Sequence, residues 1–173
     1  MDLLAQIIIA LIPSAAVVAV VYIMLKKSGE KEVASLSLQI KKERQKFFLE
    51  PRVEAHQRIV LFLERINPHN LVMRLHNPQL SAIAFQGELL KNIRNEYDHN
   101  VAQQIFISPQ SWEMVKKSKE ETIKIFNIAA KQMDEKASAT ELSGKVFELI
   151  AEIEELPTDI TIKQLKGELQ RLF

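Results

Sequence analysis

RVEAHQRIVLFLERI, residues 52–66, is the stretch that decides the fold of this 173-residue chain. Its apolar side chains recur at steps of three and four residues and form one broad side, comprising Val53, Ile59, Val60, Leu61, Phe62, Leu63 and Ile66. This period predicts a helix whose apolar side lies in a core. His56 lies on the same side, so we expect it to be a partly buried core histidine and not a ligand.

Capping residues followed by proline divide the chain after this helix. Asn67-Pro68, Asn77-Pro78 and Ser108-Pro109 each place a cap-forming side chain before a proline at the first helical position. Together with a cap at residues 138–140 and a stop at Leu156-Pro157, they predict successive helices. We therefore expect an all-α fold in which residues 51–173 form a bundle of about four or five helices.

The longest of these predicted helices covers residues 79–106. One face is predicted to carry its apolar side chains, namely Ile83, Leu90, Ile93, Tyr97, Val101 and Ile105. Gly87 lies inside this helix, where glycine costs about 1 kcal/mol relative to alanine. Two explanations remain open for that glycine: the close approach of another helix, or a locally weak turn.

Before the bundle, residues 3–25 contain no charged side chain. As a helix, this run would reach roughly 35 Å, enough for a hydrocarbon core of about 30 Å. It predicts an N-terminal transmembrane anchor over residues 1–27. Lys26, Lys27 and Lys31 follow the run, so the positive-inside bias predicts an outside N-terminus and a cytoplasmic body. This is the topology of a single-pass protein of the bacterial inner membrane.

Residues 28–50 predict a basic juxtamembrane helix. Val33, Leu36, Ile40 and Phe47 form a thin apolar stripe on an otherwise charged segment. The helix could continue through Pro51, or a new helix could begin there. The pattern also leaves open whether the stripe forms a coiled coil with a second copy.

Charge is unevenly distributed along the chain. The whole chain carries 23 Lys and Arg against 22 Asp and Glu, yet residues 26–58 carry a net +4 and residues 110–173 a net −2. The overall charge of +1 gives no reason to expect a nucleic-acid partner. Beside a membrane, the basic segment predicts contacts with anionic lipid headgroups through Lys26, Lys27, Lys41, Lys42, Arg44 and Lys46.

Few residue patterns in the chain point to chemistry. The absence of cysteine excludes disulfides, thiolate metal sites and thiol catalysis, and no phosphate-loop, dinucleotide, nucleophile-elbow or zincin motif occurs. The run Glu96-Tyr97-Asp98-His99 is the one candidate, because Glu and His three residues apart share a helix face and could bind a metal. A complete di-iron site would need further carboxylates and a second such pair.

Residues 61–68, 70–72 and 95–105, together with the amino-terminal run, resemble an uncharacterised family of small, bacterial, membrane-anchored helical proteins. The family has no assigned reaction. The resemblance implies that the stretches around Glu64-Arg65 and residues 96–104 are family features, for packing or for a partner. The candidate interaction residues are Glu64, Arg65, Glu96, Asp98, His99 and Gln103.

These observations predict a membrane-tethered helical interaction or scaffold protein that is non-catalytic and needs no cofactor. Its expected partner is a protein or a second copy of the chain. The alternative is a small membrane-bound metal-binding protein or enzyme that uses the Glu96-Tyr97-Asp98-His99 run.

Overall fold

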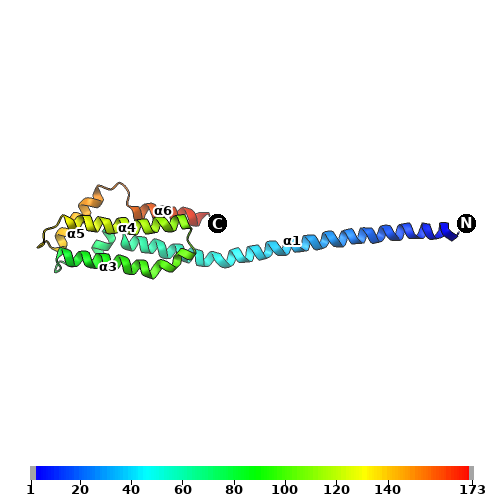
Figure 1. The fold of residues 1–173 in the computed structure, drawn as a ribbon, viewed down its shortest axis with the longest axis horizontal. Coiled ribbons are helices and arrows are strands. Elements are labelled where there is room, and N and C mark those ends of the chain that lie inside the picture. The colour runs from blue at the N-terminus through cyan, green and yellow to red at the C-terminus, as the bar shows by residue number, and fades with distance from the viewer. Residues whose placement is uncertain (1–2, 172–173) are drawn as a thin grey trace. The chain divides into compact units, whose positions relative to one another are not determined.

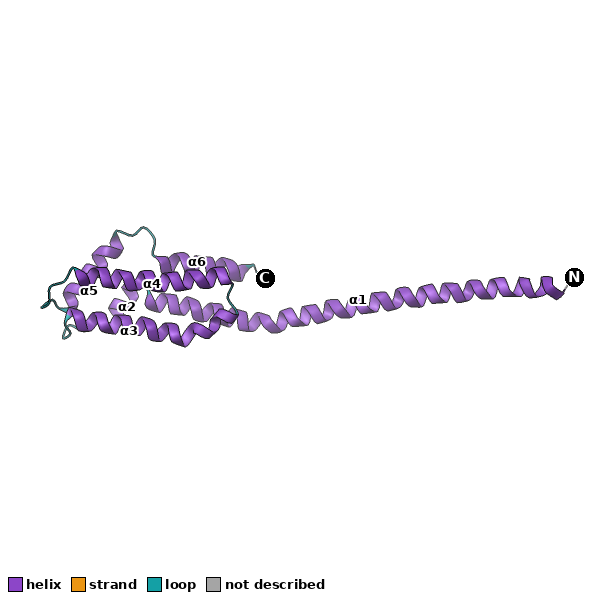
Figure 2. Ribbon diagram, viewed as in Figure 1, coloured by secondary structure: helices purple, strands orange, loops and turns teal. Residues whose placement is uncertain are grey.

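The computed structural model describes the backbone of residues 3–171 and the side chains of residues 17–171. This part of the chain is helical, and Figure 2 shows its helices joined by short loops without a strand. Figure 1 follows the chain in colour, from blue at the N-terminus to red at the C-terminus. The elements are α1 (Leu3–Ile66), α2 (Pro68–Leu75), α3 (Ala82–Asn100), the 3-10 helix η1 (Val101–Ile105), α4 (Pro109–Lys131), α5 (Ala139–Ala151) and α6 (Pro157–Gln170).

The chain divides into two units, Met1–Phe48 and Leu49–Phe173. In the first unit, every described side chain, from residue 17 to residue 48, is exposed. The second unit is a helical bundle built from the end of α1 and from α2 to α6. Only this second unit has a core among the described residues.

The transmembrane part of the predicted fold is wrong. Among the residues that the structure describes, none of the helices combines the length and the apolar character needed to cross a membrane. The predicted span lies partly outside the described side chains. The predicted single-pass location at the bacterial inner membrane, with an outside N-terminus, loses its basis with the span.

Helix α1 continues through Pro51 to Ile66 as one helix, which decides between the two alternatives for this proline. Proline has no N–H to donate to the carbonyl four residues earlier, so a helix passing through it loses one hydrogen bond. The following turns bury Ala55, Ile59 and Phe62, and this packing stabilises the helix after Pro51.

The core of the bundle forms around α4, which packs against α3, α5 and α6. Phe62 of α1, Phe85 of α3 and Phe126 of α4 are fully or almost fully buried in it. His56 is 2% exposed, which confirms the prediction of a core histidine. The core is therefore shared between the end of α1 and the later helices, as the period of residues 52–66 predicts.

Side-chain caps begin four of the helices. Asn67, Ser81, Ser108 and Ser138 each accept a hydrogen bond from a backbone N–H of the first turn. Two of the three predicted cap–proline starts are thereby confirmed. The third is wrong: Asn77 accepts from the N–H of Gln79 in a turn, and α3 begins only after Ser81.

The predicted apolar face of the third helix is correct only in its middle. Ile93 is buried and Tyr97 packs against the core, but Ile83 is 66% exposed and Ile105 is 77% exposed. The buried face of α3 consists of Ala82, Phe85, Leu89 and Ile93.

Candidate functional site

Among the candidate interaction residues, Arg65 and Glu96 pair with each other across two helices. The guanidinium of Arg65 on α1 lies 2.7 Å from Oε1 of Glu96 on α3, and the Glu96 side chain is 17% exposed. Beside this pair, Glu64 accepts a hydrogen bond from the Asn70 amide at 3.3 Å. Glu64, Arg65 and Glu96 therefore hold α1 against α2 and α3.

The remaining candidate residues take no part in the Arg65–Glu96 pair. His99 is exposed, and its Nδ1 lies 2.7 Å from the backbone carbonyl of Asn95, to which it donates. Asp98 is exposed, and the Gln103 side chain is half-buried in η1. Within the described residues, no group of three or more His, Asp or Glu side chains is placed to hold a metal ion.

Tyr97 lies on the opposite side of α3 from His99 and belongs to the packing of the bundle. Its ring stacks on Trp112 of α4 with centroids 5.8 Å apart and tilts against Phe62 of α1 at 6.0 Å. The ammonium of Lys119 lies 4.1 Å from the ring centroid, a cation–π distance. The Glu96-Tyr97-Asp98-His99 run thus divides between an inter-helix ion pair, a packed aromatic ring and two exposed side chains.

The six cations predicted to contact lipid all lie on α1 within the first unit, and all are exposed. Phe47 and Phe48 follow them, with exposures of 74% and 52% and rings in an edge-to-face contact at 5.4 Å. The segment therefore presents cations and two aromatic rings to solvent.

A polar cluster that the sequence does not reveal surrounds Glu168 of α6. Its carboxylate accepts from the backbone N–H of Ser108 at 3.0 Å, from the Ser108 hydroxyl at 2.7 Å and from the Ser111 hydroxyl. The buried His56 ring places Nε2 3.6 Å from the same carboxylate. The cluster ties α6 to the N-terminus of α4 and to α1.

The pKa of Glu168 is below its ordinary value. Desolvation by burial raises the pKa. The hydrogen bonds from Ser111 and Ser108 and the nearby His56 together lower it by more than burial raises it. A carboxylate that already accepts three hydrogen bonds at a helix N-terminus is held in its charged form. This arrangement favours a structural role for Glu168.

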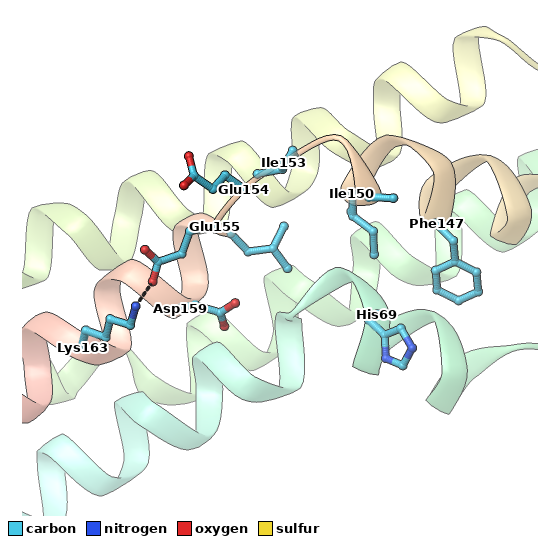
Figure 3. A pocket seen from close by; sticks show the side chains of 10 residues that line it. His69, Phe147, Ile150, Ile153, Glu154, Glu155, Asp159 and Lys163 are labelled. Atoms are coloured by element: carbon cyan, nitrogen blue, oxygen red, sulfur yellow. Dashed lines mark ion pairs between the residues drawn. The ribbon is translucent and has the colours of Figure 1, made fainter.

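A hollow of about 950 Å³ opens beside the connection from α5 to α6, and we call it the α5–α6 hollow. Figure 3 shows Phe147 of α5 facing His69 of α2 at one end, with their ring centroids 5.3 Å apart. At the other end, Lys163 of α6 pairs with Glu155 at 2.5 Å. Its lining consists of Phe147, Ile150, Ala151, Ile153 and Leu156, and of His69, Glu154, Glu155, Asp159 and Lys163.

The hollow combines an apolar surface with an acidic rim. Ile153 and Glu154 are exposed in the loop, whereas Phe147, Ile150 and Leu156 are half-buried. The rim has three carboxylates and one ammonium. The hydrogen bond and charge of Glu155 raise the pKa of Lys163. The hollow is therefore suited to an apolar group flanked by positive charge.

Asn67 fixes one wall of the hollow. It caps α2, and its amide also lies 3.3 Å from the Thr158 hydroxyl and 3.5 Å from the Asp159 carboxylate at the start of α6. From α4, the Ser118 hydroxyl donates to the Pro157 carbonyl at 2.8 Å. The first turn of α6 is thus held by polar contacts from the cap of α2 and from α4.

One sequence signal could have revealed this site. Residues 146–162 contain five acidic side chains and no Lys or Arg, while apolar residues recur between the acids. The helices on either side of Pro157 are predicted from the apolar period and from the proline alone, without this local excess of negative charge.

Comparison with known proteins places the chain in a family. No curated protein and no solved structure matches it. Residues 2–172 match a family described as "Family of unknown function (DUF7935)", which confirms the resemblance to an uncharacterised family. Because the match covers nearly all of the sequence, the chain belongs to this family of unknown function, DUF7935.

Proposed function

We propose that this protein is a non-catalytic, helical protein-interaction module. Its α5–α6 hollow binds a segment of a protein partner that offers an apolar side chain flanked by Lys or Arg. The observation that carries the proposal is the apolar surface of the hollow with the carboxylates of Glu154, Glu155 and Asp159 around it. Interaction sites commonly combine an apolar centre with a polar rim that selects the partner by charge.

Two features support a protein partner over other ligands. The acidic rim would repel the phosphates of a nucleic acid, whose binding depends on a basic surface. The side chains of the alternative metal or catalytic site do not come together, because Glu96 pairs with Arg65 and His99 donates to a backbone carbonyl of its own helix. The hollow, in contrast, gathers half-buried apolar side chains and charged groups from α2, α5 and α6 at one place.

A panel of labelled peptides tests the proposal by fluorescence anisotropy with the full chain. The panel holds a Phe-containing basic peptide of arbitrary sequence, the same peptide with Phe replaced by Ser, and the same peptide with Lys and Arg replaced by Glu. We expect only the first to bind, and we expect its affinity to fall as salt is raised, because screening shortens the reach of surface charges.

Matched charge reversals locate the binding. The double variant E154K/E155K should weaken binding of the basic aromatic peptide about tenfold or more, because it reverses the rim. E120K/E121K changes the net charge by the same amount on α4, away from the hollow, and should leave the affinity within about twofold. Equal loss in both variants, or no binding by any peptide, would contradict the proposal.

A further inference from the structure

The exposed end of the first unit carries the chemistry that the α5–α6 hollow selects. Residues 41–48, KKERQKFF, hold four cations and one acid and end in two phenylalanines. We call them the docking segment. Phe47 is the most exposed phenylalanine in the part of the chain that the structure describes, at 74%. Exposing an aromatic ring is unfavourable in water, so this surface gains from being covered.

The docking segment and the hollow are complementary in charge. The segment has a net charge of +3, and the hollow has three carboxylates and one ammonium in its lining. The one cation of the hollow, Lys163, is already paired with Glu155, which leaves Glu154 and Asp159 to meet incoming cations. Opposite charges at an interface attract partners and fix their register.

The size of the hollow also suits this occupant. Its volume of about 950 Å³ lies at the upper end of the roughly 300–1,000 Å³ that is typical of binding pockets. Its surface already includes the Phe147 ring, which is tilted against the His69 ring, so an incoming phenylalanine would meet aromatic and aliphatic groups.

We propose that the docking segment of one copy binds in the α5–α6 hollow of a second copy. This inference rests on the proposed function, and it names the partner. The two contacting surfaces are different patches of the same chain, so a single contact leaves one free patch on each copy. The two free patches can bind each other in a reciprocal pair, or bind further copies in a larger ring or an open chain.

Sedimentation velocity of the full chain over a range of concentrations tests the proposal. We expect the average mass to rise with concentration in the wild type and to stay at that of the monomer in F47A/F48A. E154K/E155K should also stay monomeric. E120K/E121K, with the same charge change, should assemble like the wild type, as should V33A/L36A, which removes exposed apolar side chains of α1 outside the segment.

Mixing the two monomeric variants gives the decisive result. F47A/F48A keeps an intact hollow, and E154K/E155K keeps an intact docking segment, so an equimolar mixture should form a one-to-one complex that grows no further. Circular dichroism verifies that both variants remain helical. A mixture that stays monomeric, a wild type that is monomeric at all concentrations, or assembly lost in V33A/L36A would overturn the proposal.

The outcome separates this proposal from the one on which it rests. If the wild type does not assemble but the basic aromatic peptide still binds, the hollow has another partner and only the self-docking is wrong. If assembly occurs through the hollow, the same peptide should compete and lower the average mass.

Discussion

The carboxylate of Glu168 lies at the N-terminus of another helix and accepts from both the backbone N–H and the hydroxyl of Ser108, at 3.0 Å and 2.7 Å. The two residues are 60 positions apart in the sequence. Ser108 is the N-cap of α4, so its hydroxyl serves the first turn of α4 and the carboxylate of α6 at once. This contact joins α4 and α6. The local sequence pattern predicts the capping role of Ser108, but it does not predict that Glu168 binds there.

Replacing Glu168 with Gln should destabilise the bundle. Gln is neutral and has one acceptor oxygen for the donors that surround the carboxylate, so we expect a loss of about 1–3 kcal/mol in the free energy of unfolding. Urea denaturation followed by circular dichroism measures it. E113Q, which disrupts the exposed pair of Glu113 with Lys116, is the control and should cost less than about 1 kcal/mol. Equal losses in E168Q and E113Q would show that the hydrogen bonds of Glu168 stabilise the bundle no more than an exposed ion pair does.

The stability of the bundle should fall in acid, and Glu168 should account for part of that fall. Because the folded-state pKa of Glu168 is lowered, its contribution is present above the ordinary value of 4.5 and is lost as pH drops through the folded pKa. Glu141, whose pKa is lowered chiefly by a hydrogen bond from the Ser138 backbone, acts in the same direction. The wild type should therefore lose more stability between pH 5 and pH 3 than E168Q does. Parallel pH profiles of the two proteins would contradict this.

The capping box of α5 offers a local test. Ser138 accepts from the N–H of Glu141 at 3.3 Å, and the Glu141 carboxylate accepts from the N–H of Ser138 at 2.8 Å. S138A should lower the free energy of unfolding by about 1 kcal/mol, because the N–H of Glu141 loses its acceptor. S37A, on the exposed part of α1, should have almost no effect on a denaturant transition of the bundle. A cost for S138A as small as that of S37A would contradict the assigned cap.

Local patterns predicted helix starts well where a side chain could cap in place, and less well where tertiary contacts decide. Asn67, Ser108 and Ser138 act as caps, but Asn77 forms a turn, and Ser81 caps α3 four residues later. The bridge between Ser81 and Ser138 accompanies that later start. A pattern of cap and proline identifies a chain reversal more securely than it identifies the first helical residue.

The apolar period of α3 shows a second limit. Ile83 and Ile105 fit the predicted face, yet both are exposed. Ile83 lies within α3 but beside its buried face of Ala82, Phe85, Leu89 and Ile93, whereas Ile105 lies in the 3-10 helix η1, which replaces α3 after Asn100. A helical period applies only while the helix lasts. In the candidate site, the sequence pointed to Glu96 and His99 because of their spacing. It could not show that Arg65 of another helix forms an ion pair with Glu96. It also did not show that a hollow lies beside the connection from α5 to α6.

The ion pair of Arg65 and Glu96 should have a small structural effect and no effect on metal content. Both side chains are partly exposed, so solvent screening limits the pair, and a double-mutant cycle with R65M and E96Q should give a coupling of about 0.5–1 kcal/mol. Elemental analysis of the purified wild type and E96Q should give the same metal content. Metal bound in the wild type and lost in E96Q would restore the metal-site interpretation.

The surroundings of Gly87 decide between the two explanations for this glycine inside a helix. It is exposed on α3, and a methyl group added there would meet no atom within 4 Å, which excludes the close approach of a helix in the described structure. What remains is a weak turn, so G87A should raise the free energy of unfolding by about 0.5–1 kcal/mol through helix propensity. The reverse change at an exposed position of the same helix, A84G, should lower it by a similar amount. Both are measured from urea midpoints at unchanged slope. A loss of stability in G87A would contradict the weak-turn explanation.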